Sequence, residues 1–245
     1  MKNELFKTEL EYIENEKVRN FTKFALDNLP DYFFTVAASS TGKYHPSYAL
    51  GDGGLVRHTK AAARFAKHML SVEQNKAKFN ELERSCILCG IILHDGWKHG
   101  EGKSSFTVHE HPQVCADWVL TNNNFDDLLN KEERELISSA IASHMGEWNT
   151  TKRSKVVLHK PTTEIQEFVH ICDYLASRKD IEVLFNETEQ KSEVKLEEYK
   201  FPFGKHKGQL ITDVAKNHMD YLQWMKGNMR NLQEPLKSFL DELVK

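Results

Sequence analysis

The sequence predicts an all-α fold, a helical bundle, followed by a small α+β module at the C-terminal end. Apolar residues recur at the i, i+3, i+4 and i+7 spacing of a helix face in six successive segments. Alternating, strand-like runs are scarce in the same part of the chain. After a charged stretch, short aromatic runs around glycines replace the helical pattern. We therefore expect two structural parts.

Composition is that of an ordinary globular protein. Of the 245 residues, 40% are hydrophobic and 28% are charged, and the net charge of -3 argues neither for nor against a nucleic-acid partner. The first residues lack the apolar core of a signal peptide, and no apolar run reaches membrane length. We expect a cytoplasmic protein with no membrane partner and four reduced cysteines. Cys86-x-x-Cys89 lacks a second pair, so we expect it to pack in the core.

The first two expected helices cover residues 4–29 and 55–69. The first is a long amphipathic pattern that ends at Pro30. The irregular stretch 31–54 is rich in Ser, Gly and Pro, and loops of this length tend to be functional. In the second helix, His58 lies on the apolar stripe and not on the wet face. His68 lies near the end of this helix, and we expect it to be structural.

The third helix, residues 80–95, is the most apolar part of the chain. Its apolar run ends abruptly at His94 and Asp95, and Gly96 is a natural helix stop. An unpaired carboxylate in a dry interior is costly, so this pair needs a partner. A satisfied His-Asp pair is one solution. A metal ion is the other, since carboxylate oxygen and neutral imidazole nitrogen are both good ligands.

Three more helices are expected over residues 112–120, 131–144 and 164–178. His111 precedes Pro112, which suits the first turn of a helix. His144 closes the apolar stripe of the next helix. Asp173 lies in the middle of an apolar face, where a carboxylate needs a partner.

Several helices thus each place a metal-capable side chain on a buried stripe. The residues are His58, His94 with Asp95, His144 and Asp173, with His111 at the start of another helix. For any one of them, a hydrogen-bonded core side chain is the simpler interpretation. Their recurrence favours a metal site, because helical bundles build such sites from inward-facing side chains of separate helices.

Three segments carry a resemblance to a known family. Gly53–Thr59 resembles a helix with a first histidine, Leu93–Lys98 resembles a His-Asp-x-x-Lys signature, and His170–Asp173 resembles a helix with a last aspartate. In this order they are similar to the HD-domain superfamily of metal-dependent phosphohydrolases. The resemblance implies a bundle with its core at residues 50–180 and one divalent ion. The implied ligands are His58, His94, Asp95 and Asp173.

Two further segments bear on the number of ions. Glu110-His111-Pro112 and Ser143–Gly146 resemble additional ligands of two-metal HD enzymes, which include phosphodiesterases and a 3′–5′ exoribonuclease group. Some members carry a His-His pair where this chain has His144-Met145, so one ligand is missing here. His109 is an alternative ligand to His111, but Pro112, directly after His111, favours His111 as the ligand. One or two ions are implied, and Mn, Fe, Co, Ni, Zn or Mg remain open.

The resemblance implies phosphoester hydrolysis by metal-activated hydroxide. Asp95 would bridge two ions and Lys98 would contact a phosphate oxygen, although a solvated loop lysine is the alternative for Lys98. We expect a phosphodiester of a nucleotide or nucleic acid as substrate, cut by a nuclease or nucleotide phosphodiesterase. The alternatives are a single-metal nucleoside 5′-monophosphate phosphatase and a non-catalytic metal-containing binding protein.

The expected domains are residues 1–186, a linker at 187–198 and the α+β module at 199–245. In the module, Tyr199–Leu210 is expected to form two short strands around a glycine turn, with helices near 212–216, 219–225 and 232–244. This part resembles a segment of unknown function in bacterial and phage proteins, some of them attached to nucleases. Its basic residues among aromatics could touch phosphates or stack on bases. Alternatively, Phe201, Phe203 and Trp224 form the core of a separate unit.

Overall fold

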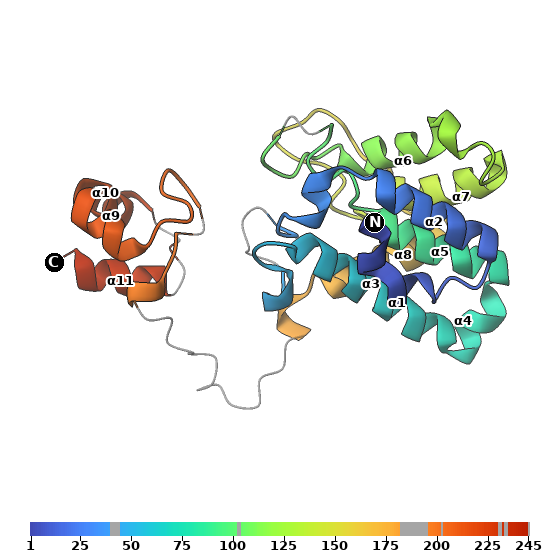
Figure 1. Ribbon diagram of the computed structural model, residues 1–245, viewed down its shortest axis with the longest axis horizontal. Helices are drawn as coiled ribbons and strands as arrows, with labels where there is room; N and C mark the ends of the chain where they lie inside the picture. The colour runs from blue at the N-terminus through green and yellow to red at the C-terminus, as the bar shows by residue number, and fades with distance from the viewer. Residues whose placement is uncertain are drawn as a thin grey trace. The chain divides into compact units, whose positions relative to one another are not determined.

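The chain divides into two compact units, Met1–Glu182 and Val183–Lys245 (Figure 1). A computed structural model describes residues 1–39, 45–101, 104–181, 196–201, 203–229, 232 and 235–244. Every regular element in these ranges is a helix, so the predicted all-α bundle is confirmed. No helix in the same ranges is both long and apolar enough to cross a membrane. Most of the predicted linker, residues 187–195, lies outside the described residues.

The first unit is a bundle around one buried helix, α5 (Glu81–Leu93). All residues from Ser85 to Leu93 are buried, because α5 packs against helices on several sides. Its neighbours are α2 (Glu16–Asn28), α3 (Gly54–Ser71), α7 (Lys131–Ala142) and α8 (Glu164–Ala176). The α6 helix (His111–Thr121) packs against α7. The shorter elements are η1 (Lys2–Phe6), α1 (Lys7–Leu10), η2 (Asp31–Phe34), η3 (Ser47–Ala49), α4 (Glu73–Lys78), η4 (Asn123–Phe125) and η5 (Lys179–Ile181).

Side-chain caps define where three of the long helices begin. Asn80, Asn130 and Thr163 each accept a hydrogen bond from the backbone NH three residues later, and the Glu or Gln at that position bonds back to the cap. Such capping boxes satisfy amides that a helix start otherwise leaves without partners. The starts of α5, α7 and α8 are therefore set by local sequence, close to where they were predicted.

The predicted single helix at residues 4–29 is wrong. The chain instead forms η1 and α1, turns at residues 11–15, and starts α2 at Glu16. Asn15 caps α2 by accepting a hydrogen bond from the Val18 amide, and its own amide donates to Ser85 Oγ at 3.0 Å. The break follows because this contact with α5 fixes Asn15 in an extended conformation that cannot continue a helix.

The second unit is helical, so the predicted α+β module is wrong. It contains η6 (Leu196–Glu198), α9 (Ile211–Asn217), α10 (Met219–Asn228) and α11 (Leu236–Leu243). These surround a small core of Phe201, Ile211, Val214, Leu222, Met225, Leu236 and Leu240. Where two strands were expected, the described residues form a single antiparallel bridge between Lys200 and Leu210. Beyond Leu210 the pairing cannot extend, since α9 begins directly after this residue.

Candidate metal centre

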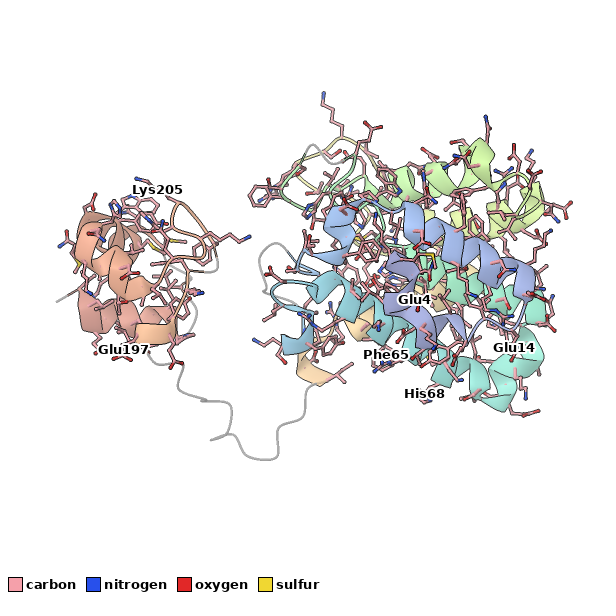
Figure 2. The ribbon with its side chains drawn as sticks, in the orientation of Figure 1. Glu4, Glu14, Phe65, His68, Glu197 and Lys205 are labelled. Atoms are coloured by element: carbon pink, nitrogen blue, oxygen red, sulfur yellow. The ribbon has the colours of Figure 1, made fainter. Side chains whose placement is uncertain are left out.

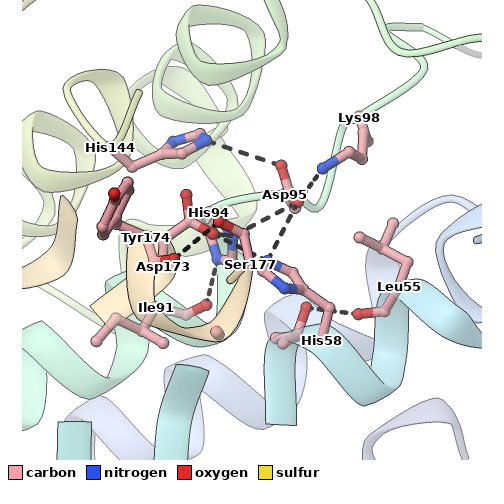
Figure 3. A network of polar contacts seen from close by, with 12 residues as sticks. Leu55, His58, Ile91, His94, Asp95, Lys98, His144, Asp173, Tyr174 and Ser177 are labelled. Atoms are coloured by element: carbon pink, nitrogen blue, oxygen red, sulfur yellow. Dashed lines mark hydrogen bonds and ion pairs between the residues drawn. The ribbon is translucent and has the colours of Figure 1, made fainter. Parts of the chain in front are cut away.

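The six predicted ligands come together in the interior of the first unit. Figure 3 shows five of them, His58, His94, Asp95, His144 and Asp173. They arrive on five segments: His58 from α3, His94 with Asp95 from the turn after α5, His111 from the start of α6, His144 from the turn after α7, and Asp173 from α8. The four histidines and Asp95 are each at most 2% exposed, whereas the Asp173 side chain is 19% exposed. The centre is therefore closed on most sides and reaches solvent beside Asp173.

Three of the histidines are oriented in the same way. The Nδ1 atoms of His94, His111 and His144 lie 2.6, 2.7 and 2.8 Å from the carbonyl oxygen of the third preceding residue. A carbonyl oxygen only accepts, so each Nδ1 carries the proton and donates. In a neutral ring this leaves the Nε2 lone pair free, and all three Nε2 atoms face the centre. The ring orientation thus prepares three imidazoles as metal ligands.

The Asp95 carboxylate lies between two sets of side chains. Its Oδ2 atom faces His94 Nε2 at 3.5 Å and His58 Nε2 at 3.9 Å. Its Oδ1 atom faces His111 Nε2 at 3.0 Å and His144 Nε2 at 3.8 Å. Asp173 joins the first set, with Oδ1 at 2.9 Å from His58 Nε2 and 3.3 Å from His94 Nε2. One carboxylate is therefore shared by two potential coordination sites.

These residues fit a divalent metal ion. Ligand atoms of His58, His94 and Asp95, and those of Asp95, His111 and His144, lie within 4.8 Å of one another. His94 Nε2 and Asp95 Oδ1 are buried and have no hydrogen-bond partner. His111 Nε2 and His144 Nε2 are 3.3 Å apart, and both rings already donate through Nδ1. Two facing acceptors need a proton or a cation between them, and nitrogen and carboxylate ligands suit divalent transition metals.

Charge in the centre is tightly coupled. Burial alone would lower the pKa of His94, but Asp95 and Asp173 outweigh it and raise this pKa to about 10. Burial and the nearby His94 charge lower the pKa of His144 to about 3. Burial would raise the pKa of Asp95 and of Asp173. Lys98 and His94 instead hold the Asp95 pKa well below its usual value, and His94 and His58 do so for Asp173. Without ions, both carboxylates are ionised and the His94 ring is protonated.

Lys98 lies inside this network and is not a solvated loop residue. Its Nζ atom donates a hydrogen bond to Asp95 Oδ2, and the residue is 8% exposed. The turn that carries it is tightly packed, because the Gly96 amide bonds to Leu93 O and a Cβ atom at Gly96 would come within 2.6 Å of Leu29 Cδ2. A side chain at Gly96 would therefore force Leu29 to shift, and α5 already ends at Leu93.

Other residues at the centre carry no periodic signal in the sequence. The His45 ring packs edge-on against His58 with 5.0 Å between centroids. His170 Nδ1 donates to the His144 carbonyl oxygen at 2.7 Å. Tyr32 bonds through its hydroxyl to Gly100 O at 2.9 Å and stacks on His99, thereby supporting the turn after Asp95. For His170, the one sequence feature that points to the centre is its position three residues before Asp173.

The structure also distinguishes the two histidines before Pro112. His111 is 2% exposed and faces Asp95, as described above. His109 instead lies 3.2 Å through Nε2 from the Val156 carbonyl oxygen and stays outside the cluster. The four cysteines are buried free thiols, and Cys86 and Cys89 lie in the core of α5.

Comparison with known families agrees with this geometry. The HD domain family matches residues 55–178, a range that contains all six clustered residues. The family described as exodeoxyribonuclease X-like C-terminal matches residues 201–230. No curated protein and no solved structure matches the chain. Since the first match covers half of the 245 residues, the chain belongs to the HD domain family, which implies a metal-dependent phosphohydrolase.

Proposed function

We propose that this chain hydrolyses a phosphodiester of a nucleotide or nucleic acid with two divalent ions at the Asp95 centre. The observation that carries the proposal is the position of the Asp95 carboxylate, whose two oxygens face separate pairs of histidines. A carboxylate in this position can be shared by two ions a few ångströms apart, the arrangement used for in-line displacement at phosphorus.

The ligands divide into two sets that share Asp95. His58, His94 and Asp173 would complete the first site, whereas His111 and His144 would complete the second. His144 also lies within 4.8 Å of ligand atoms of His94 and Asp173, so the two sites would be adjacent. Bound divalent ions lower the pKa of water and neutralise the negative charge of phosphoryl oxygens. The mixed donor set accepts Mn, Fe, Co, Ni, Zn or Mg, so the metal has to be found by experiment.

The remaining residues prepare the site for a phosphate. Lys98 provides a buried positive charge at Asp95. Once bound ions neutralise the Asp95 carboxylate, the Lys98 ammonium can bind a non-bridging phosphate oxygen. The carbonyl bonds to Nδ1 keep the three rings oriented without any substrate. The solvent-facing side of Asp173 is where a substrate would approach.

The choice of a nucleic-acid or nucleotide substrate has separate support. The match of residues 201–230 is to a family described from the C-terminal part of an exodeoxyribonuclease. A module of that kind beside an HD domain favours a phosphodiester over a phosphate monoester. The HD domain alone would leave the substrate open.

The test is a substrate panel assayed with each divalent metal after removal of ions by chelator. Single-stranded oligonucleotides, cyclic nucleotides and nucleoside 5′-monophosphates represent the candidate classes. We expect cleavage of one of the diesters, and about a 1000-fold or greater loss in Asp95→Asn, since metal charge stabilisation is worth several kcal/mol and each 1.36 kcal/mol is tenfold in rate. His68→Ala, exposed on the same α3 helix as His58, is the matched control and should keep full activity.

Two outcomes would contradict the proposal. Release of phosphate from nucleoside 5′-monophosphates, with no diester cleaved, would assign a single-metal nucleotidase. Absence of turnover on every substrate, with metal bound, would leave a non-catalytic metal-containing binding protein.

A further inference from the structure

The second unit exposes aromatic side chains that its own core does not use. Of the three aromatic residues expected in that core, Phe201 is buried at 1% exposure, while Phe203 is 37% and Trp224 is 54% exposed. An exposed tryptophan on a unit this small is unusual, because burial of its ring would stabilise the core. Packing therefore explains Phe201 but not the other two.

Trp224 is the exposed end of a row of rings. Tyr221 and Trp224 lie one turn apart on α10, and their rings stack with 6.1 Å between centroids and an angle of 24°. The Tyr221 ring also packs against the His206 ring, with 4.7 Å between the ring centroids. The His206 and His218 ring centroids are 4.6 Å apart. His206 is 3% exposed and is held by a hydrogen bond from Nδ1 to Gln209 Oε1 at 2.8 Å. The row is thus anchored in the unit and presents a preset aromatic face.

A basic loop lies against the same row. In loop 203–209, Gly204 has a φ of +79°, and a Cβ atom there would come within 2.6 Å of Tyr221 Oη, so the loop touches the ring. The loop carries Lys205 and Lys207, both exposed, and no carboxylate. Among the residues that the structure describes, neither lysine has an ion-pair partner. Figure 2 places Lys205 and the acidic residue Glu197 at opposite ends of this unit.

We propose that loop 203–209 together with Tyr221 and Trp224, the loop–Trp224 surface, binds a single-stranded polynucleotide. Unpaired bases expose faces that stack on aromatic rings, and their backbone phosphates are attracted to lysines. A duplex hides those faces inside the helix, so it lacks the stacking part of the interaction. DNA and RNA offer the same two chemical groups to this surface. The inference does not rest on hydrolysis by the HD domain.

The test measures binding of the full-length chain to fluorescein-labelled oligo-dT, oligo-rU and a duplex by anisotropy, with chelator present to prevent cleavage. Trp224→Leu should weaken single-strand binding about 5- to 150-fold, the effect of losing one stacked base. Trp224→Phe keeps an aromatic face and should bind nearly as the wild type does. Because Trp224 is exposed, both variants should keep the wild-type melting temperature, which circular dichroism checks.

The lysines are tested through salt dependence. Each phosphate contact on a single strand contributes about 0.7 to the slope of log affinity against log salt. Lys205→Gln combined with Lys207→Gln should lower that slope by about 1.4. Lys237→Gln, which removes an exposed charge from α11, is the control and should not change it.

Several results would overturn the proposal. They are no single-strand binding by the wild type, duplex binding as tight as single-strand binding, an equal loss in Trp224→Phe and Trp224→Leu, and an unchanged salt slope in the double lysine variant. Preference between oligo-dT and oligo-rU would identify the natural polymer, and either preference supports the surface. Since no turnover is measured, the outcome is independent of whether the HD domain proves to cleave diesters.

Discussion

Removal of His144 should separate the two proposed metal sites. In the proposed division of ligands, His144 belongs to the set around Asp95 Oδ1, with His111 as the other histidine. Its ligand atom also lies within 4.8 Å of those of His94 and Asp173. His144→Ala leaves that site two side-chain ligands, which is too few to hold an ion at micromolar metal. The other site keeps His58, His94, Asp95 and Asp173. We therefore expect two ions per chain in the wild type and one in His144→Ala.

The size of the effect follows from mass action. An ion at 100 times its dissociation constant stabilises the folded state by about 2.7 kcal/mol. For a domain the size of Met1–Glu182, 1 kcal/mol corresponds to about 2–4 °C in melting temperature. Each ion should thus raise the melting temperature by about 5–10 °C, giving about 10–20 °C for the wild type and half of that for His144→Ala.

The assay is calorimetry of chelated and metal-loaded protein, with metal content per chain from mass spectrometry. His58→Ala should lose the first ion, and His68→Ala, exposed on the same helix, should behave as the wild type. The assignment of two metal sites would be refuted if His144→Ala retained two ions or the full wild-type increase in melting temperature. It would equally fail if the wild type bound a single ion.

Three further predictions concern Gly146, the charges of the metal centre and the buried cysteines. Gly146→Ala should cost about 1–3 kcal/mol and lower occupancy of the second site, because Gly146 has a φ of +58° and a Cβ atom would lie 2.2 Å from the His170 ring; melting temperature and metal content check this. The chelated protein should lose stability as pH rises from about 6.5 toward 10, because the stabilisation from the raised His94 pKa is complete below about 6.5 and disappears across this window. It should also lose stability as pH falls below about 4, because the pKa values of Asp95 and Asp173 are lowered. Metal should therefore increase the melting temperature more at pH 8 than at pH 6, as calorimetry would show, and an equal increase would contradict the assignment of His94 as a ligand. The four cysteines should resist thiol reagents until the protein unfolds, because burial raises their pKa values.

The ligands of the candidate site were accessible from the sequence because each leaves a local signal. His58, His144 and Asp173 interrupt apolar stripes at helical spacing, and His94 with Asp95 ends an apolar run. His45 and Tyr32 leave no such signal, since they lie in an irregular stretch and meet the site only through tertiary contacts. Local pattern therefore predicts ligands on helices better than their supports from loops.

The same distinction explains the errors in the fold. Helix starts with a capping box were predicted closely, because the box lies within four residues of sequence. The break before α2 depends on the contact between Asn15 and Ser85, 70 residues apart, while the apolar pattern runs on through it. In the second unit, the aromatic and glycine pattern of Tyr199–Leu210 was typical of a hairpin. The pattern does not indicate that α9 begins at Ile211, directly after the single bridge between Lys200 and Leu210.

Lys98 explains how so charged a centre can exist in a buried helical bundle without ions. Two ionised carboxylates in a dry interior would repel each other and cost several kcal/mol, unless positive charge lies close by. The chain supplies that charge itself, from the Lys98 ammonium on Asp95 and from the protonated His94 ring between Asp95 and Asp173. Ion binding therefore has to displace a proton from His94 and compete with Lys98. In the proposed function, an ion bound at Asp95 would neutralise that carboxylate, and the Lys98 ammonium would then be available to a substrate phosphate.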